Sequence, residues 1–227
     1  ITLLLYAGGM TTSIKAGMAF LDWPLSNGSV NPAGWLTESD KMAEHSHRLL
    51  GMKIGLLSIG LFLWTYLRES RDWVRTLARV LLWVVILQGL LGGARVRFDQ
   101  LNIMSDHNLL AQSFAVVHAC GAMVVLGILV TLTLASTRRW IEASAGLNVQ
   151  QPTGVKRWGI IATVSIFLQI LVGAIMRHAD AGLALVKFPM STATNWLPTY
   201  WNFDVSVHFA HRIGAILVTV ILLVFLC

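Results

Sequence analysis

Residues 109–136 read LLAQSFAVVHACGAMVVLGILVTLTLAS, a stretch without a single Asp, Glu, Lys or Arg. A helix that crosses the hydrocarbon core of a bilayer needs about 20 mostly apolar residues, so this stretch is long enough to span. The rest of the chain has the same character, because 56% of its 227 residues are hydrophobic and only 12% are charged. This composition excludes an ordinary soluble domain and predicts an integral membrane protein in contact with lipid.

Apolar segments of spanning length recur along the chain and are separated by short polar stretches. The sequence therefore predicts an all-α fold, a polytopic transmembrane helical bundle with six helices. The predicted helices cover residues 1–21, 44–67, 74–94, 109–136, 158–176 and 205–227.

The cations predict the orientation in the membrane. Lys and Arg number 17 against 11 Asp and Glu, a formal charge of +6. They cluster in the short stretches 68–75 and 138–157, so they indicate topology rather than a phosphate-binding face, and we expect no nucleic-acid partner. By the positive-inside rule these two loops and the N-terminus face the cytoplasm. The loops at 22–43, 97–108 and 177–203 then face outward.

An internal repeat organises the chain. Residues 8–24 align without a gap with residues 173–189, and Glu44-x-x-His47-Arg48 corresponds to His208-x-x-His211-Arg212. The repeat predicts a duplicated architecture of four plus four helices, truncated before the last two. The predicted domains are a first four-helix bundle at 1–140 and the first two helices of a second bundle at 155–227.

Three histidines lie within apolar segments, where ionisable side chains usually face a bundle interior and mark function. His47, His118 and His211 all fall near the outer ends of their predicted helices. Imidazoles from different helices of a bundle form the usual bis-histidine haem site, so we predict that these three ligate haem iron. Zinc is disfavoured, because Cys120 and Cys227 are isolated. The alternative for any one histidine is a hydrogen bond to a neighbouring helix.

Charged residues beside these histidines are the other candidates for the site. Arg48, Arg212 and Arg95 are placed where a guanidinium could pair with a haem propionate, although snorkelling to the membrane surface is the alternative. Glu44 stands three residues before His47, on the same helical face, and could move protons as the catalytic group. The alternative for Glu44 is a carboxylate that only begins the helix and offsets its dipole.

Taken together, the short motifs of this chain resemble the haem A synthase family in order and spacing, over nearly the whole sequence. The motifs are Gly8-Gly9 through Gly17, Asp22-Trp23-Pro24, Glu44-x-x-His47-Arg48-Leu49-Leu50-Gly51, Gln88-Gly89-x-x-Gly92, Val117-His118-Ala119, Gly173 through Gly182 and His208-x-x-His211-Arg212.

The resemblance implies an enzyme that oxidises a methyl group of haem O to a formyl group, making haem A for cytochrome c oxidase. It places the substrate haem O between His47 and His118, with Glu44 in proton transfer. It assigns His211 to a permanent haem b whose second ligand lies beyond this sequence. It also implies a bacterial cell membrane, haem sites toward the outer side, and haem O synthase and cytochrome c oxidase as partners.

One departure from the family pattern and two competing functions accompany this interpretation. Many family members carry a cysteine pair in the first outer loop, whereas residues 22–43 contain none, so we expect no mechanism that requires such a pair. A diheme b-type membrane cytochrome that relays electrons from quinol would need the histidines but not Glu44. A membrane assembly factor without catalysis would need no haem.

Overall fold

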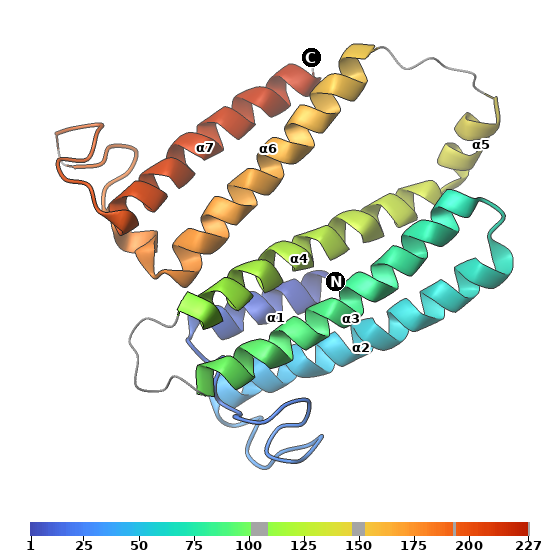
Figure 1. Ribbon diagram of the computed structural model, residues 1–227, viewed down its shortest axis with the longest axis horizontal. Helices are drawn as coiled ribbons and strands as arrows, with labels where there is room; N and C mark the ends of the chain where they lie inside the picture. Colours follow the sequence, from blue (N-terminus) through green and yellow to red (C-terminus); the bar gives the residue numbers. More distant parts are fainter. Residues whose placement is uncertain (101–108, 147–152, 193, 227) are drawn as a thin grey trace. The chain divides into compact units, whose positions relative to one another are not determined.

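The computed structural model describes residues 1–100, 109–146, 153–192 and 194–226. Within them the chain is helical and contains no β-strand, which confirms the all-α polytopic bundle. Five helices are long and apolar enough to cross a membrane. Part of the predicted outer loop at 97–108 lies outside the described residues. The helices, shown in Figure 1, are α1 (Thr2–Ser13), α2 (Ser39–Arg68), α3 (Asp72–Gln100), α4 (Leu109–Ala135), α5 (Arg138–Gly146), α6 (Thr153–His178), the 3-10 turn η1 (Ala181–Leu183) and α7 (Phe203–Leu226).

The chain forms two compact units, Ile1–Gly146 and Leu147–Cys227. In the first unit α2, α3 and α4 lie side by side, and α1 packs on α2 (Figure 1). Its apolar core lies between α3 and α4, where Leu81 is fully buried. In the second unit α6 packs against α7, and η1 contacts both helices.

The first apolar segment does not form one helix over residues 1–21, because α1 ends at Ser13. Lys15 adopts a positive φ of 56°, which breaks the helix, and the chain then turns so that Phe20 is fully buried. The second unit repeats this ending, since α6 stops at His178 and Asp180 has a φ of 55°. The five spanning helices are therefore α2, α3, α4, α6 and α7.

Helix α2 begins at Ser39, five residues earlier than predicted. Lys41 pairs with Glu38 at 2.8 Å in the first turn. Glu44 consequently lies in the second turn, inside the helix, and it does not begin the helix as the alternative interpretation held. Both Glu44 and His47 are therefore held at fixed positions by regular helix.

The connection between α2 and α3 is tied to the end of α4. Arg71 donates hydrogen bonds to both carboxylate oxygens of Glu69, at 2.9 and 2.7 Å, and to the carbonyl oxygen of Ala135 at 2.9 Å. These side-chain hydrogen bonds from Arg71 lower the pKa of Glu69 to about 2. The predicted cytoplasmic ends of three helices are thus joined through one guanidinium group.

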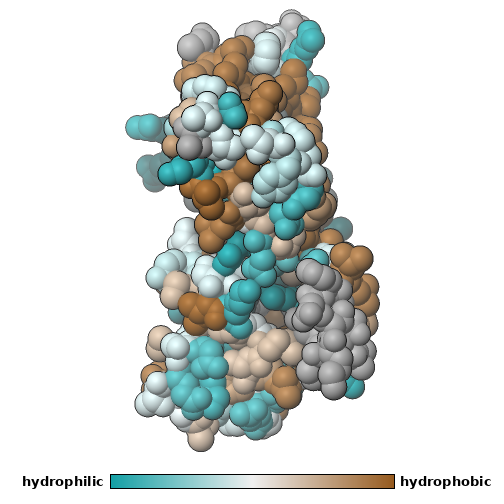
Figure 2. Space-filling view, turned by 90° about the vertical axis from the view of Figure 1, so that its left-hand side faces the viewer, coloured by the Kyte–Doolittle hydropathy of each residue, from teal (hydrophilic) through white to brown (hydrophobic). Residues whose placement is uncertain are grey.

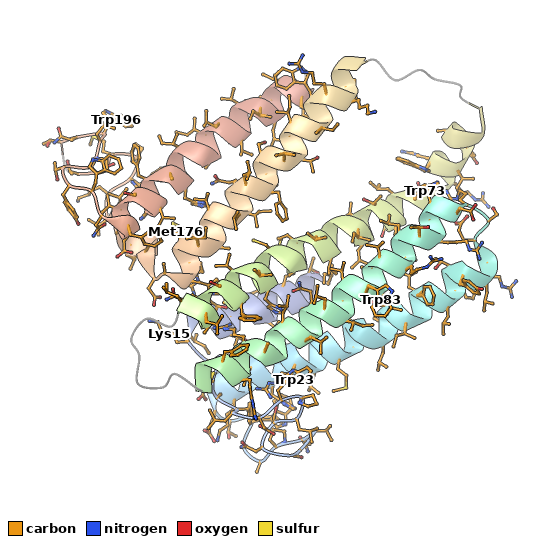
Figure 3. The ribbon with its side chains drawn as sticks, viewed as in Figure 1. Lys15, Trp23, Trp73, Trp83, Met176 and Trp196 are labelled. Carbon is orange, nitrogen blue, oxygen red and sulfur yellow. The ribbon has the colours of Figure 1, made fainter. Side chains whose placement is uncertain are left out.

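Apolar side chains are prominent in the loop that joins α6 and α7. Leu183, Val186 and Phe188 are 82%, 81% and 85% exposed. Figure 2 shows exposed hydrophobic residues interspersed with hydrophilic ones on one face, and Figure 3 places Trp196 in the same loop. Exposed apolar groups of this size are typical of contact with lipid or with other protein segments.

Candidate functional site

The fold brings His47 of α2 and His118 of α4 together inside the first unit. Their ring centres are 6.4 Å apart and their planes are perpendicular, at 90°. Two imidazoles on opposite sides of one metal ion have ring centres about 6.2 Å apart, given metal–nitrogen bonds of about 2.0 Å and about 1.1 Å from nitrogen to ring centre. The observed separation is close to this value, so His47 and His118 are near enough to hold one metal ion between them.

Glycines on neighbouring helices make room for these rings. A Cβ at Gly8 of α1 would lie 2.9 Å from Cε1 of His47, and a Cβ at Gly92 of α3 would lie 3.4 Å from Cε1 of His118. The Nδ1 atom of His47 is buried and has no hydrogen-bond partner among the described residues. Each of the helices α1 to α4 thus contributes a residue to one site lined by two imidazoles.

The close approach of Gly8 to His47 gives a direct test. A Gly8→Ala substitution should push the His47 ring from its position, because Cβ atoms essentially never lie closer than 3.0 Å to another heavy atom. We expect bound haem in the first unit to fall several-fold, since metal sites respond strongly to ligand misplacement. Gly9→Ala is the matched control, because nothing lies within 4 Å of a Cβ at Gly9. Equal haem content in the two variants, measured in purified protein, would contradict the inference that Gly8 leaves room for the His47 ring. We call such a glycine the cradle of its histidine.

Glu44 is buried one turn before His47 and is fully engaged as an acceptor. It is 3% exposed; its Oε2 accepts the Phe20 backbone N–H at 3.1 Å and its Oε1 pairs with Arg48. The guanidinium of Arg48 also donates to the carbonyl oxygens of Phe20 at 3.0 Å, of Asp22 at 2.6 Å and of Leu25. Glu44 and Arg48 together fix the segment at 20–25 over the N-terminal part of α2.

The described contacts of Arg48 and Arg95 lie in the loop after α1, and the propionate role of the arginines stays a prediction. Both Nη atoms of Arg48 are occupied by backbone carbonyls and by Glu44, so this side chain serves as a clamp for the loop. Arg95 of α3 has its guanidinium against the loop, since a Cβ at Gly17 would lie 3.3 Å from its Nη2. In the same loop, the indole of Trp23, labelled in Figure 3, fills the space where Gly93 of α3 lacks a Cβ.

The second unit has a similar set of contacts between an arginine and the preceding loop, with a histidine in place of the glutamate. His208 is 8% exposed, and its Nδ1 and Nε2 lie 3.2 Å from the Leu185 backbone nitrogen and 3.2 Å from Nε of Arg212. A neutral imidazole has one lone pair, so it accepts a hydrogen bond from one of these two donors at a time. Arg212 donates to the carbonyl oxygens of Leu185 at 2.6 Å and of Met190 at 3.2 Å. An imidazole thus takes the place that the Glu44 carboxylate holds in the first unit.

His45 is held away from the paired imidazoles. Its Nδ1 lies 3.0 Å from Ser26 Oγ and its ring meets Trp35 edge-on, with ring centres 4.7 Å apart. This agrees with the expectation that neighbours on a helix diverge. In the described part of the chain, no group of three or more His, Cys, Asp or Glu residues could hold a metal ion. The donor set there fits a two-imidazole site and not a zinc cluster.

Comparison with known proteins shows the family of this chain. A family model described as cytochrome oxidase assembly protein matches residues 1–227. A haem A synthase of Shouchella clausii is 31% identical over 231 residues, which cover 99% of this chain and 70% of the relative. The chain belongs to the haem A synthase family. A haem A synthase of Bacillus licheniformis is 31% identical and one of Symbiobacterium thermophilum 29%, over 94% and 97% of this chain and 67% and 68% of those relatives.

Within this haem A synthase family fold, the third predicted ligand has its own cradle in the second unit. A Cβ at Gly173 of α6 would lie 2.8 Å from Cε1 of His211, as Gly8 does for His47. The side-chain amide of Gln169 lies 3.0 Å from His211 Nδ1 and 2.8 Å from the His211 carbonyl oxygen. Gln169 was missed from the sequence, although the Gln-x-x-x-Gly spacing it shares with Gln88 was the signal available.

Proposed function

We propose that this protein oxidises a methyl group of haem O to a formyl group, and that the substrate binds between His47 and His118. The separation of 6.4 Å between the two ring centres carries this proposal, because it fits a shared iron atom. The relatives named haem A synthase support the reaction. The glycines at 8 and 92 support the site, since they leave room for both rings.

Glu44 is the proposed catalytic residue, and its role is to accept a proton. It lies one helical turn from His47, and both of its oxygens act as hydrogen-bond acceptors. The Phe20 N–H and the Arg48 guanidinium hold the carboxylate in one orientation, which a proton acceptor needs. Oxidation of a methyl group releases protons, and a fixed carboxylate beside the substrate is suited to take them.

His211 is the proposed ligand of a resident haem b in the second unit. The donor set fits, because a neutral imidazole is a good iron ligand, Gly173 leaves space for its ring, and Gln169 contacts its Nδ1 edge. When bound, a low-spin haem supplies one-electron transfer. The side chains around it hold the ligand in place, while His208 and Arg212 fix the overlying loop.

The proposed location is a bacterial cell membrane, with both sites toward its outer side. The paired imidazoles and the clamped loops lie at the helix ends opposite the basic stretches at 68–75 and 138–157. By the positive-inside rule those stretches face the cytoplasm. Haem O synthase as the source of substrate and cytochrome c oxidase as the user of product complete the proposal.

A diheme b-type cytochrome that relays electrons from quinol is the second candidate. The matching glycine cradles at His47 and His211 favour it, because both halves hold their histidine in the same way. A carboxylate in one half and an imidazole in the other favours the enzyme, since two relay sites would not need that difference.

Haem extraction from ligand variants tests the proposed substrate site. We expect His47→Ala and His118→Ala to lose bound haem O and to retain haem b, because each removes one ligand of the first unit only. Porphyrins extracted from the purified full-length protein would be identified by chromatography. His45→Gln is the control with the same loss of one imidazole, and it should keep both haems because His45 faces Ser26. Unchanged haem O in both ligand variants would refute the two-site division.

A further inference from the structure

Two glutamines occupy corresponding places beside the histidines, although the catalytic proposal assigns them nothing. Gln169 of α6 contacts both the ring and the backbone carbonyl of His211, at 3.0 and 2.8 Å. Its amide fills a notch on α7, because a Cβ at Gly214 would overlap it. The glutamine is therefore fixed in position by the partner helix as well as by its two hydrogen-bonding contacts.

The first unit carries the same arrangement between α3 and α4. The amide of Gln88 fills the notch at Gly121 of α4, three residues after His118, as Gly214 lies three residues after His211. Gly92 stands four residues after Gln88, and a Cβ at Gly92 would lie 3.4 Å from Cε1 of His118. Oε1 of Gln88 is buried without a hydrogen-bond partner among the described residues.

The spacing is duplicated in full in the second unit. Gln169 and Gly173 are four residues apart, and Gly173 is the cradle of the His211 ring. In both units one helix contributes a glutamine and a glycine one turn apart, and the next helix contributes a histidine and a glycine one turn apart. An arrangement that recurs in two helix pairs is unlike incidental packing.

We propose that Gln169 is a positioning residue that orients the imidazole of His211 for iron binding, and that Gln88 has the corresponding role for His118 on the ground of its spacing and its place at Gly121. This inference rests on the proposed function of these histidines as haem ligands. A metal-bound histidine usually gives its other ring nitrogen a hydrogen-bond partner, which fixes the ring and tunes its basicity. As placed, the side-chain nitrogen of Gln169 faces Nδ1 of His211. With its amide turned over, Gln169 presents Oε1 as the acceptor for a proton on Nδ1, which leaves Nε2 to bind the metal.

An amide suits this place better than a charged group. It carries both a donor and an acceptor, so one side chain can serve Nδ1 with or without its proton. It brings no net charge into a membrane-spanning segment, where an unpaired ion is costly. Leucine would fill a similar volume but would leave Nδ1 without this partner, and glutamate would place a negative charge there.

Variants of Gln169 in the full-length protein provide the test. We expect Gln169→Leu to reduce low-spin haem content by about ten-fold, in line with loss of other ligand-orienting groups. We expect Gln169→Glu to retain the haem and to lower its reduction potential, because a full negative charge near Nδ1–H increases electron donation to iron. The readouts are the absorption spectrum and the midpoint potential, so activity is not needed.

Gln88→Leu is the matched variant in the first unit. It should reduce binding of haem O and leave the potential of the haem at His211 unchanged. Gln169→Leu should instead reduce the haem at His211 and leave binding of haem O unchanged. If both Gln169 variants keep the native spectrum and potential, the positioning role is wrong. If Gln169→Leu fails to fold, the potential of Gln169→Glu still decides. Separately, a low-spin signal that survives His211→Ala would overturn the proposed haem ligand itself.

Discussion

Replacing Glu44 with Gln is expected to block conversion of haem O while haem O stays bound. The amide keeps an oxygen for the Phe20 N–H and nearly the same volume. It gives up the ion pair with Arg48, but Arg48 keeps its carbonyl partners in the loop, so the loop is expected to remain in place. The amide cannot accept a proton, and loss of general acid–base help costs about 10² to 10⁴-fold in rate. The ratio of haem A to haem O in extracts of the purified protein would measure the effect.

The second unit offers the matched control for this prediction. His208→Gln changes the corresponding side chain, which also accepts a loop N–H and contacts an arginine. If loss of the loop contact alone stopped catalysis, the two variants would be impaired alike. We expect conversion to fall far more in Glu44→Gln. Normal haem A production in Glu44→Gln would remove Glu44 from the mechanism and favour the electron-relay alternative.

The second large effect is expected for His211→Ala, which should abolish the low-spin haem b signal. Alanine leaves no donor on α7 at this position, and the facing Gly173 cannot supply one. A reduced-minus-oxidised absorption spectrum would show the loss, and haem O should remain in the first unit.

On α7, the other histidine that could replace His211 as a ligand is His208, and both of its ring nitrogens already have contacts. Its Nδ1 accepts the Leu185 N–H and its Nε2 contacts Arg212. A native spectrum in His211→Ala would therefore mean that the haem is held elsewhere, and the proposed second site would be wrong.

The sequence predicted five of its six spanning segments correctly, because length and apolar composition are local properties. The pairing of His47 with His118 was implied by the resemblance to the haem A synthase family. The sequence did not predict that α1 ends at Ser13, since residues 14–21 are apolar enough to continue a helix. That ending depends on the buried position of Phe20 and on its N–H contact with Glu44, 24 residues away. Such a long-range contact leaves no periodic signal in the chain.

The arginines illustrate the same limit at the site. Their position next to the histidines predicts contacts with haem propionates, which stays a prediction, but it gave no sign that Arg48 and Arg212 also bind carbonyl oxygens of the loops that precede their helices. A backbone carbonyl is present at every residue, so no side-chain motif announces it as a partner. Gln169 was overlooked for a related reason, because its importance depends on contacts across a helix pair.

The paired loop clamps carry an evolutionary consequence. Since Arg48 and Arg212 secure their loops chiefly through main-chain oxygens, the side chain one turn earlier can be a carboxylate or an imidazole without loss of the lid. One copy of the repeat can therefore carry the proposed proton acceptor Glu44 while the other carries His208 at the same place. The side chain at the position of Glu44 and His208 can therefore change while the arginine one turn later still holds the loop.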